Sequence, residues 1–290
     1  MIWFLCAKKS LPFLFADDTN LFFNGNNQND IIDTINIELH EISKWLKVNK
    51  LSLNVKKTHY MVFTTRKCMP EQFDIYIDGY SIERVKHTKF LGVFIDDKLN
   101  WKKHISYISS KISRGLGIVI KARKLLSLSA LKTLYFSFIY PYFTYCNQVW
   151  GSACDSHLHP LIILQKRCVR IITLSRAREH TDPLFTRLGL LKIHGINKYL
   201  ICKFMYRWYH NELPPSFKNI FVSVSSIHDH NTRQNTHLYF RKANTSLGKS
   251  KFSYRASYIW NLVLQARINP DTSECVFART VKQCIKVGIL

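Results

Sequence analysis

The sequence predicts an α+β protein, with short antiparallel strands and one helix in the first third and mostly helices after it. Up to residue 97, short apolar runs, some alternating with polar residues, are separated by turn signals, a pattern typical of strands. Beyond Asp96-Asp97, apolar residues recur every three or four positions, which is typical of helices. This change predicts a unit over 1–97, a helical unit over 98–213 and a less regular basic tail over 214–290.

Two hairpins are predicted in the first third. The apolar runs 11–15 and 21–23 flank a polar centre at 16–20. Alternating apolar residues lead into Asp78-Gly79, a strong signal for a two-residue hairpin turn. We also expect a helix over 29–48, a strand over 59–64 and a further apolar run over 90–95.

The helices of the remainder are predicted from the apolar residues that would line one face. In the segment 101–124 these residues are Ile105, Ile108, Ile112, Leu116 and Val119. Ser127 is expected to cap a helix over 130–140, and Pro141 to break it. Further helices are predicted over 158–172, 183–193, 196–210 and 276–287.

Charge is distributed unevenly along the chain. Its net charge is +23, from 42 Lys and Arg against 19 Asp and Glu. Residues 1–100 hold 13 basic and 12 acidic side chains, whereas residues 101–290 hold 29 basic and 7 acidic ones. The cationic part predicts a polyanionic partner such as nucleic acid.

The cysteines and the hydropathy of the sequence indicate in which cellular compartment the protein resides and whether it spans a membrane. The 8 cysteines include no CxxC pair, which favours reduced thiols in a cytoplasmic or nuclear protein. The uncharged segment 133–154 is long enough for a membrane span, but it contains Pro141, Asn147, Gln148 and several hydroxyl groups. We expect a buried, broken helix there and no membrane, with a membrane protein left as an alternative.

The acidic pair Asp17-Asp18 lies between two apolar strands. Adjacent carboxylates repel one another, and sites that tolerate them normally offer divalent cations such as Mg²⁺. Two-metal phosphoryl transfer uses such ligands. A solvated turn is the alternative, because Asp is common in turns for its local hydrogen bonds.

The residues around this pair resemble the catalytic hairpin of reverse transcriptases, specifically those of jockey-like non-LTR retrotransposons. The hairpin sequence is LPFLFADDTNLFF. Further similar segments follow in order: Trp45, LSLN at 51–54, KKT at 56–58, MVF at 61–63, Phe90-Leu91-Gly92 with Asp96 and Trp101, LQKR at 164–167, RII at 170–172, Asn231-Thr232-Arg233 and Trp260-Asn261. The resemblance implies the end of a polymerase palm, a thumb and a basic C-terminal region.

The same resemblance implies roles for individual residues. Asp17 and Asp18 would ligate Mg²⁺, and Lys57 would lie near the leaving pyrophosphate. Phe90, Leu91 and Gly92 would pack under the primer backbone. The candidates for nucleic-acid contacts are Lys166, Arg167, Arg170, Lys203, Arg207, Arg233, Arg241 and Lys242. The implied partners are an RNA template and a DNA primer.

The chain also departs from the family pattern. A second metal-binding Asp, the fingers and the template grip would lie upstream, whereas the 16 residues before Asp17 contain no acid. We therefore expect a C-terminal portion of a longer polymerase, inactive alone, for which the missing N-terminal part is a possible partner. The spacing of Cys154, His157, His159 and Cys168 matches no common zinc finger. A basic RNA- or DNA-binding protein without catalysis, or a chain that does not fold stably, are the alternatives.

Overall fold

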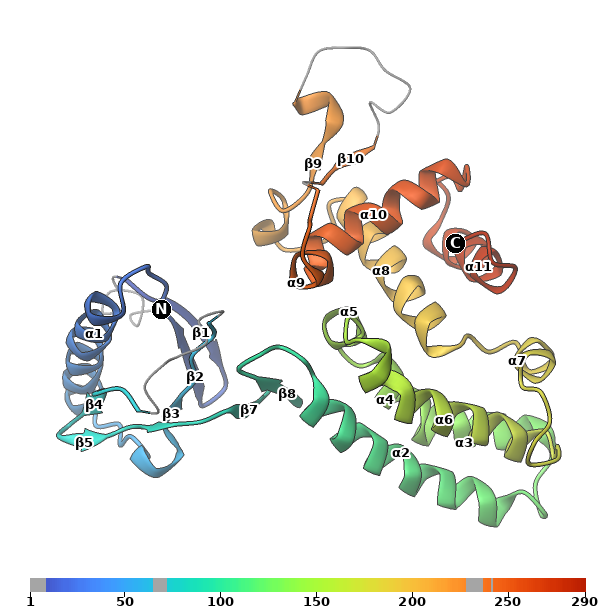
Figure 1. The fold of residues 1–290 in the computed structure, drawn as a ribbon, viewed down its shortest axis with the longest axis horizontal. Coiled ribbons are helices and arrows are strands. Elements are labelled where there is room, and N and C mark those ends of the chain that lie inside the picture. Colours follow the sequence, from blue (N-terminus) through green and yellow to red (C-terminus); the bar gives the residue numbers. More distant parts are fainter. Residues whose placement is uncertain (1–8, 65–71, 228–236, 241) are drawn as a thin grey trace. The chain divides into compact units, whose positions relative to one another are not determined.

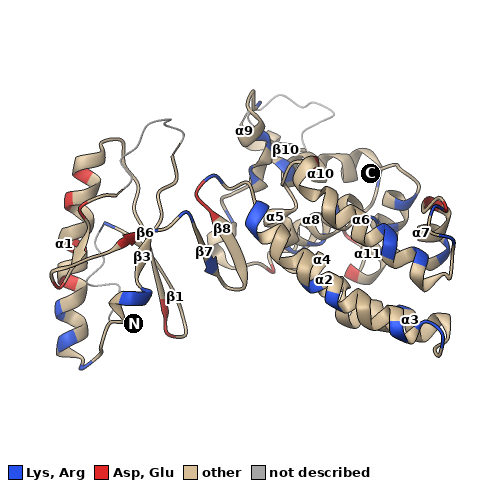
Figure 2. Cartoon of the chain, turned by 60° about the horizontal axis from the view of Figure 1, so that its bottom comes forward, with Lys and Arg blue, Asp and Glu red and all other residues tan. Residues whose placement is uncertain are grey.

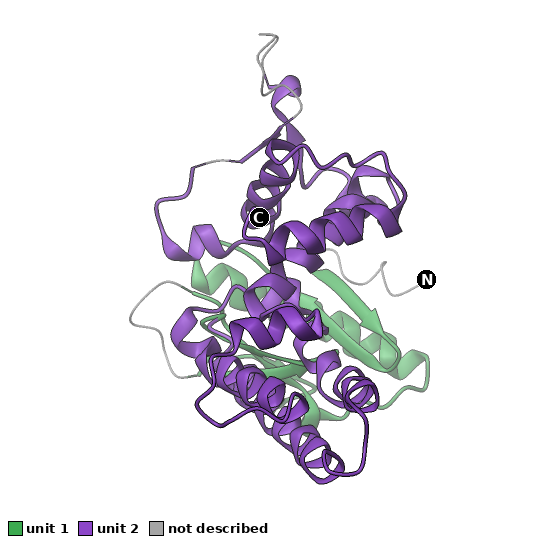
Figure 3. Cartoon of the chain, turned by 90° about the vertical axis from the view of Figure 1, so that its right-hand side faces the viewer, with its two compact units in different colours: residues 1–99 green, residues 100–290 purple. Residues whose placement is uncertain are grey.

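The computed structural model describes residues 9–64, 72–227, 237–240 and 242–290. The chain forms two compact units, Met1–Leu99 and Asn100–Leu290, coloured separately in Figure 3. We call them unit 1 and unit 2 and describe each by itself. The prediction of palm, thumb and tail segments remains a prediction.

Unit 1 combines short strands with one long helix (Figure 1). Its elements are β1 (Leu11–Phe15), β2 (Asp18–Phe22), α1 (Gln28–Val48), a 3₁₀ turn (Val55–Lys57), β3 (His59–Tyr60), β4 (Tyr76–Ile77), β5 (Tyr80–Ser81), β6 (Glu83–Arg84), β7 (His87–Phe90) and β8 (Val93–Asp96). The pairs β1–β2, β4–β5 and β7–β8 are antiparallel hairpins, and β3 pairs with β6 in parallel.

The core of unit 1 lies between α1 and the β4–β5 hairpin. Leu39 of α1 packs with Phe73, Ile75, Ile77 and Ile82, all of them buried. The predicted Asp78-Gly79 turn is confirmed, with φ of +51° and +79° at its two residues.

Asp78 also ties this turn to α1. Its carboxylate accepts hydrogen bonds from Lys47 Nζ at 2.7 Å and from the Ser43 hydroxyl. These bonds, that of Lys47 first, hold the pKa of Asp78 below its usual value. The turn and the helix are therefore joined by side chains as well as by the apolar core.

The predicted strand and apolar run both need correction. The strand expected over 59–64 ends at Tyr60. The run over 90–95 is split by a turn at Leu91 and Gly92, whose φ values are +44° and +83°. Both central residues thus adopt left-handed backbone, as a tight hairpin turn requires. The turn was not predicted because it lies within a continuous run of mostly apolar residues, whereas turns are usually recognised by polar residues.

Unit 2 is mostly helical. Its helices are α2 (Lys102–Ala122), α3 (Leu128–Phe138), α4 (Tyr140–Thr144), α5 (Asn147–Trp150), α6 (Asp155–Ile172), α7 (Asp182–Leu188), α8 (Ile193–Tyr209), α9 (Ser246–Ser250), α10 (Phe252–Gln265) and α11 (Glu274–Lys286). The short strands β9 (Val222–Ser223) and β10 (Leu238–Tyr239) pair antiparallel, and 3₁₀ turns cover Pro215–Phe217 and Val224–Ser226.

The first half of unit 2 packs around α2. All five residues predicted for its buried face are buried, and the helix packs against α3 and α6. The Ser127 hydroxyl accepts a hydrogen bond from the Ala130 backbone N–H at 3.3 Å, which confirms the predicted cap. Helix α3 ends at Phe138, and Pro141 lies in the first turn of α4, so the predicted break is confirmed.

The second half of unit 2 forms a core of its own. Met205 of α8, Trp260 and Val263 of α10, and Phe277 and Val281 of α11 are buried together. Helix α10 was not predicted from the sequence, which indicated an irregular tail over these residues. Its polar and basic residues mask a buried stripe of apolar side chains at helical spacing, Ala256, Ile259, Trp260 and Val263.

The overall class is a mixture of helices and small sheets, compatible with the predicted α+β class. Segment 133–154 divides among α3, α4, α5 and the turns between them. In the part of the chain that the structure describes, none of the helices combines the length and the apolar character that crossing a bilayer requires.

Candidate functional site

The acidic pair occupies the tip of the β1–β2 hairpin. Phe15 pairs with Asp18 across the strands, so Ala16 and Asp17 form a two-residue turn. Ala16 has a φ of +51°, the left-handed conformation that such turns impose. The predicted hairpin is confirmed, but its turn is tighter than the polar stretch 16–20, because Asp18 already belongs to β2. Both carboxylates are exposed.

The hairpin is open on its edges and rich in exposed apolar side chains. Among the described residues, neither β1 nor β2 pairs with a third strand. Leu11 and Phe15 are each 60% exposed, and Phe13 meets the ring of Phe22 edge-on with centroids 5.3 Å apart. The two acids are therefore presented to solvent, where a cation and a polynucleotide can reach them.

The residues present supply only part of a metal site. Mg²⁺ takes oxygen ligands, and adjacent Asp17 and Asp18 are of the right chemical type. Within residues 9–64, 72–227, 237–240 and 242–290, however, no three His, Cys, Asp or Glu side chains gather closely enough to hold a metal ion. The same finding covers Cys154, His157, His159 and Cys168, of which Cys168 is buried and Cys154 exposed.

The other residues that the resemblance assigned in unit 1 lie in turns or at the end of a strand. Lys57 ends the 3₁₀ turn and is exposed, and its backbone N–H donates to Asn54. Phe90 is half-buried at the end of β7. Leu91, at 39% exposure, and Gly92 form the β7–β8 turn. Exposure leaves Lys57 and this turn accessible to a ligand.

The predicted cationic contacts of unit 2 fall into two groups. Lys166 and Arg167 are exposed on α6, Lys242 is exposed after β10, and none of the three forms an ion pair within the described residues. Lys203 instead pairs with Glu274 at 2.8 Å, and Arg207 with Glu212 at 3.7 Å.

These ion pairs partly neutralise Lys203 and Arg207, which leaves less positive charge for a phosphate. The Glu274 hydrogen bond raises the pKa of Lys203, and Lys203 lowers that of Glu274. Arg170 donates from Nε to the Glu179 carbonyl at 2.8 Å. Arg233 and Arg241 lie outside the described residues, as does Asn231-Thr232. Figure 2 shows where the described Lys and Arg residues lie on the chain.

Two motif residues position the backbone. Gln165 is buried, donates to the Leu191 carbonyl at 2.9 Å and accepts from the Ile193 N–H at 3.0 Å. Asn261 accepts from the Leu238 N–H at 2.8 Å and donates to the Leu238 carbonyl at 2.9 Å. Gln165 thus joins α6 to the start of α8, and Asn261 joins α10 to β10. No signal in the sequence pointed to these roles.

Comparison with curated proteins finds related polymerases. Over 168 residues the chain is 29% identical to the probable RNA-directed DNA polymerase from transposon X-element of Drosophila melanogaster, covering 57% of this chain and 18% of the relative. It is 25% identical over 169 residues to that from transposon BS of the same species, covering 57% and 19%. It is 27% identical over 165 residues to the RNA-directed DNA polymerase from mobile element jockey, covering 55% and 18%.

These similarities relate the chain to RNA-directed DNA polymerases. All three relatives are polymerases of Drosophila mobile elements, so the predicted resemblance to the reverse transcriptases of non-LTR retrotransposons is confirmed as a sequence similarity. The matched segment spans about a fifth of the length of these relatives. No protein-family model matches the chain. No solved structure matches it either.

Proposed function

We propose that this chain is the palm-end, thumb and basic C-terminal portion of a non-LTR retrotransposon reverse transcriptase, and that its own activity is binding of the RNA template and DNA primer. Unit 1 would present Asp17 and Asp18 of the polymerase palm. Unit 2 would bind the phosphates of the duplex. The parent reaction is template-directed joining of deoxynucleotides to a primer 3′-hydroxyl, assisted by two metal ions.

The observation that carries the binding proposal is the charge of unit 2. Its boundary at Asn100 coincides with the change in charge, so unit 2 holds all 29 basic and 7 acidic residues of the second part of the chain. The positive charges repel one another, and binding to phosphates would neutralise that excess. Lys166 and Arg167 on α6 and Lys242 after β10 are the contacts that we propose, because they are exposed and outside the ion pairs of this unit.

The metal site required for catalysis is incomplete in the described residues. Asp17 and Asp18 are exposed acidic ligands, but the described residues bring no third ligand to them. We therefore propose that the 290-residue polypeptide alone does not synthesise DNA. A non-catalytic RNA- or DNA-binding protein derived from a retroelement is the second candidate, favoured by this same incompleteness.

Two measurements on the purified chain test these proposals. Fluorescence anisotropy should detect binding to an RNA–DNA hybrid with a recessed primer, and primer extension with Mg²⁺ and deoxynucleotides should show no product. The Asp17→Ala variant should bind as the wild type does. Failure to bind would contradict the nucleic-acid-binding proposal. Template-dependent synthesis that Asp17→Ala abolishes would contradict the proposed inactivity.

A further inference from the structure

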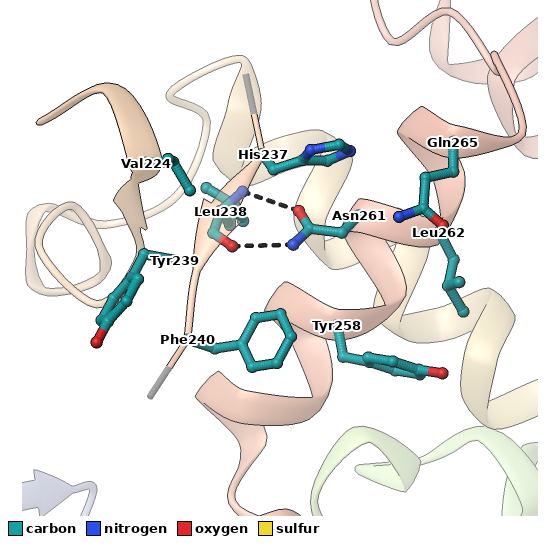
Figure 4. A pocket seen from close by; sticks show the side chains of 9 residues that line it. All are labelled: Val224, His237, Leu238, Tyr239, Phe240, Tyr258, Asn261, Leu262 and Gln265. Carbon is teal, nitrogen blue, oxygen red and sulfur yellow. Dashed lines mark hydrogen bonds between the residues drawn. The ribbon is translucent and has the colours of Figure 1, made fainter. Parts of the chain in front are cut away.

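An open groove of about 420 Å³ lies between β10 and α10 in unit 2 (Figure 4). His237, Leu238 and Phe240 line it from the strand side, and Tyr258, Asn261 and Gln265 line it from the helix. The two hydrogen bonds between Asn261 and the Leu238 backbone fix the strand against the helix at the middle of the groove. The walls of the groove are therefore held together by hydrogen bonds between two elements that are distant in the sequence.

Two aromatic side chains that line the groove, Phe240 and Tyr258, are in ring contact, and Tyr258 remains accessible. Phe240 packs edge-on against Tyr254 and Tyr258, with ring centroids 5.1 Å and 6.2 Å apart. Tyr258 is nonetheless 50% exposed, which leaves much of its ring without a protein neighbour. A braced, half-exposed ring provides a flat apolar surface on which another flat group can stack.

The stretch of chain that builds the groove is poor in acidic residues and carries exposed lysines. Between residues 213 and 265 of the sequence, Asp229 is the only acidic residue. Lys242, Lys249 and Lys251 are exposed in the segment that leads from β10 to α10. Gln265, two helical turns after Tyr258 on α10, is exposed and lines the same groove, and its amide offers both a donor and an acceptor.

We infer that this groove binds an unpaired base of single-stranded nucleic acid, with the base stacked on Tyr258 and the backbone phosphates near Lys242. The inference rests on the proposed nucleic-acid-binding function and adds a defined subsite to it. A base supplies the flat face that Tyr258 accepts. An acidic peptide would satisfy the lysines but, without aromatic residues, would leave the ring unmatched.

The test compares oligomers that carry bases, on a ribose and on a deoxyribose backbone, with one that carries none. The full chain is titrated with a fluorescein-labelled oligouridylate, with the matching oligothymidylate, and with a sugar-phosphate oligomer of the same length that lacks bases. The wild type should bind the base-containing oligomers more tightly. Tyr258→Ala should weaken that binding by roughly tenfold and leave binding of the abasic oligomer unchanged, because only the base-containing oligomers can stack on the aromatic ring.

Two matched variants complete the design. Tyr258→Phe keeps the ring and should bind as the wild type does. Tyr145→Ala removes a tyrosine of similar exposure, 53%, from elsewhere in unit 2, and should leave all three affinities unchanged. Equal binding of the base-containing and abasic oligomers, or equal losses in the two alanine variants, would overturn the base subsite while leaving phosphate binding intact. Failure of all three oligomers to bind would overturn the proposed function itself.

Discussion

The imidazole of His104 is buried in unit 2 near the start of α2. Only 2% of the residue is exposed, and its ring lies 5.5 Å from the ring of Trp150, centroid to centroid. Burial disfavours the charged form, which lowers the pKa of His104 to about 4. The folded chain therefore binds this proton less readily than the unfolded chain does.

Unit 2 should lose stability as the pH falls below the ordinary histidine pKa of about 6.5. The folded-state pKa is depressed, so the contribution of His104 is complete above pH 6.5 and declines towards pH 4. The loss should reach about 3 kcal/mol, as 1.4 kcal/mol per unit of pKa implies. Urea unfolding of unit 2 at a series of pH values measures it.

The controls for this prediction are two neutral substitutions. His104→Gln should lower stability at pH 7 but flatten its dependence between pH 7 and 4. His159→Gln, at an exposed position on α6, is the matched control and should retain the wild-type dependence. Parallel curves for wild type and His104→Gln would show that burial of this imidazole does not cause the acid sensitivity.

Among the elements, α2 carries two glycines with opposite surroundings. A Cβ at Gly115 would lie 2.8 Å from the Phe138 carbonyl oxygen, at the end of α3. A Cβ at Gly117, two positions along the same helix, would meet no atom within 4 Å beyond its chain neighbours and the backbone of its own helix. The first glycine permits a close approach of two helices, whereas the second has no contact that requires it.

Alanine at these positions should change stability in opposite directions. Gly115→Ala should destabilise unit 2 by about 1–3 kcal/mol, because backbone atoms must move to relieve the overlap. Gly117→Ala should stabilise it by about 0.5–1 kcal/mol through the higher helix propensity of alanine. Chemical denaturation of the two variants beside wild type measures both values. Stabilisation by both substitutions would mean that α2 and α3 are not packed as closely as the structure shows.

The elements that the sequence predicted correctly are those specified by neighbouring residues. The Asp78-Gly79 turn, the Ser127 cap and the buried face of α2 all depend on short-range patterns. The turn at Leu91 and Gly92 was missed because hydrophobicity does not report φ. Helix α10 was missed because its apolar stripe is interrupted by residues that face solvent.

In the candidate site, too, the features specified by neighbouring residues could be predicted and those that depend on distant residues could not. Asp17 and Asp18 are adjacent in the sequence, so their position at a hairpin tip could be predicted from the flanking apolar runs. The partners of Lys203 and Arg207, and the groove between β10 and α10, depend on tertiary contacts between segments distant along the chain. No local pattern reports which cations are neutralised by the fold and which remain accessible.

Across the whole molecule, the cations are of two kinds, those exposed to solvent and those paired with carboxylates. Lys166 and Arg167 extend from α6 into solvent, whereas Lys203 and Arg207 on α8 already face carboxylates. Lys50 and Lys56 provide exposed cations in the nearly neutral unit 1. A double substitution by glutamine at each pair removes the same charge from three different environments, so any difference reports position rather than net charge.

The salt dependence of RNA binding should distinguish these three pairs. Each phosphate contact contributes about 0.7–0.9 to the slope of log K against log salt concentration. Lys166→Gln/Arg167→Gln should therefore reduce that slope by about 1.5, and Lys203→Gln/Arg207→Gln by less, because those cations are paired with Glu274 and Glu212. Lys50→Gln/Lys56→Gln should leave it unchanged. Anisotropy titrations of the full-length variants from 50 to 300 mM salt, about the range over which such slopes are resolved, provide the values. Equal reductions in all three variants would mean that net charge alone governs binding, and that α6 is not a phosphate-binding surface.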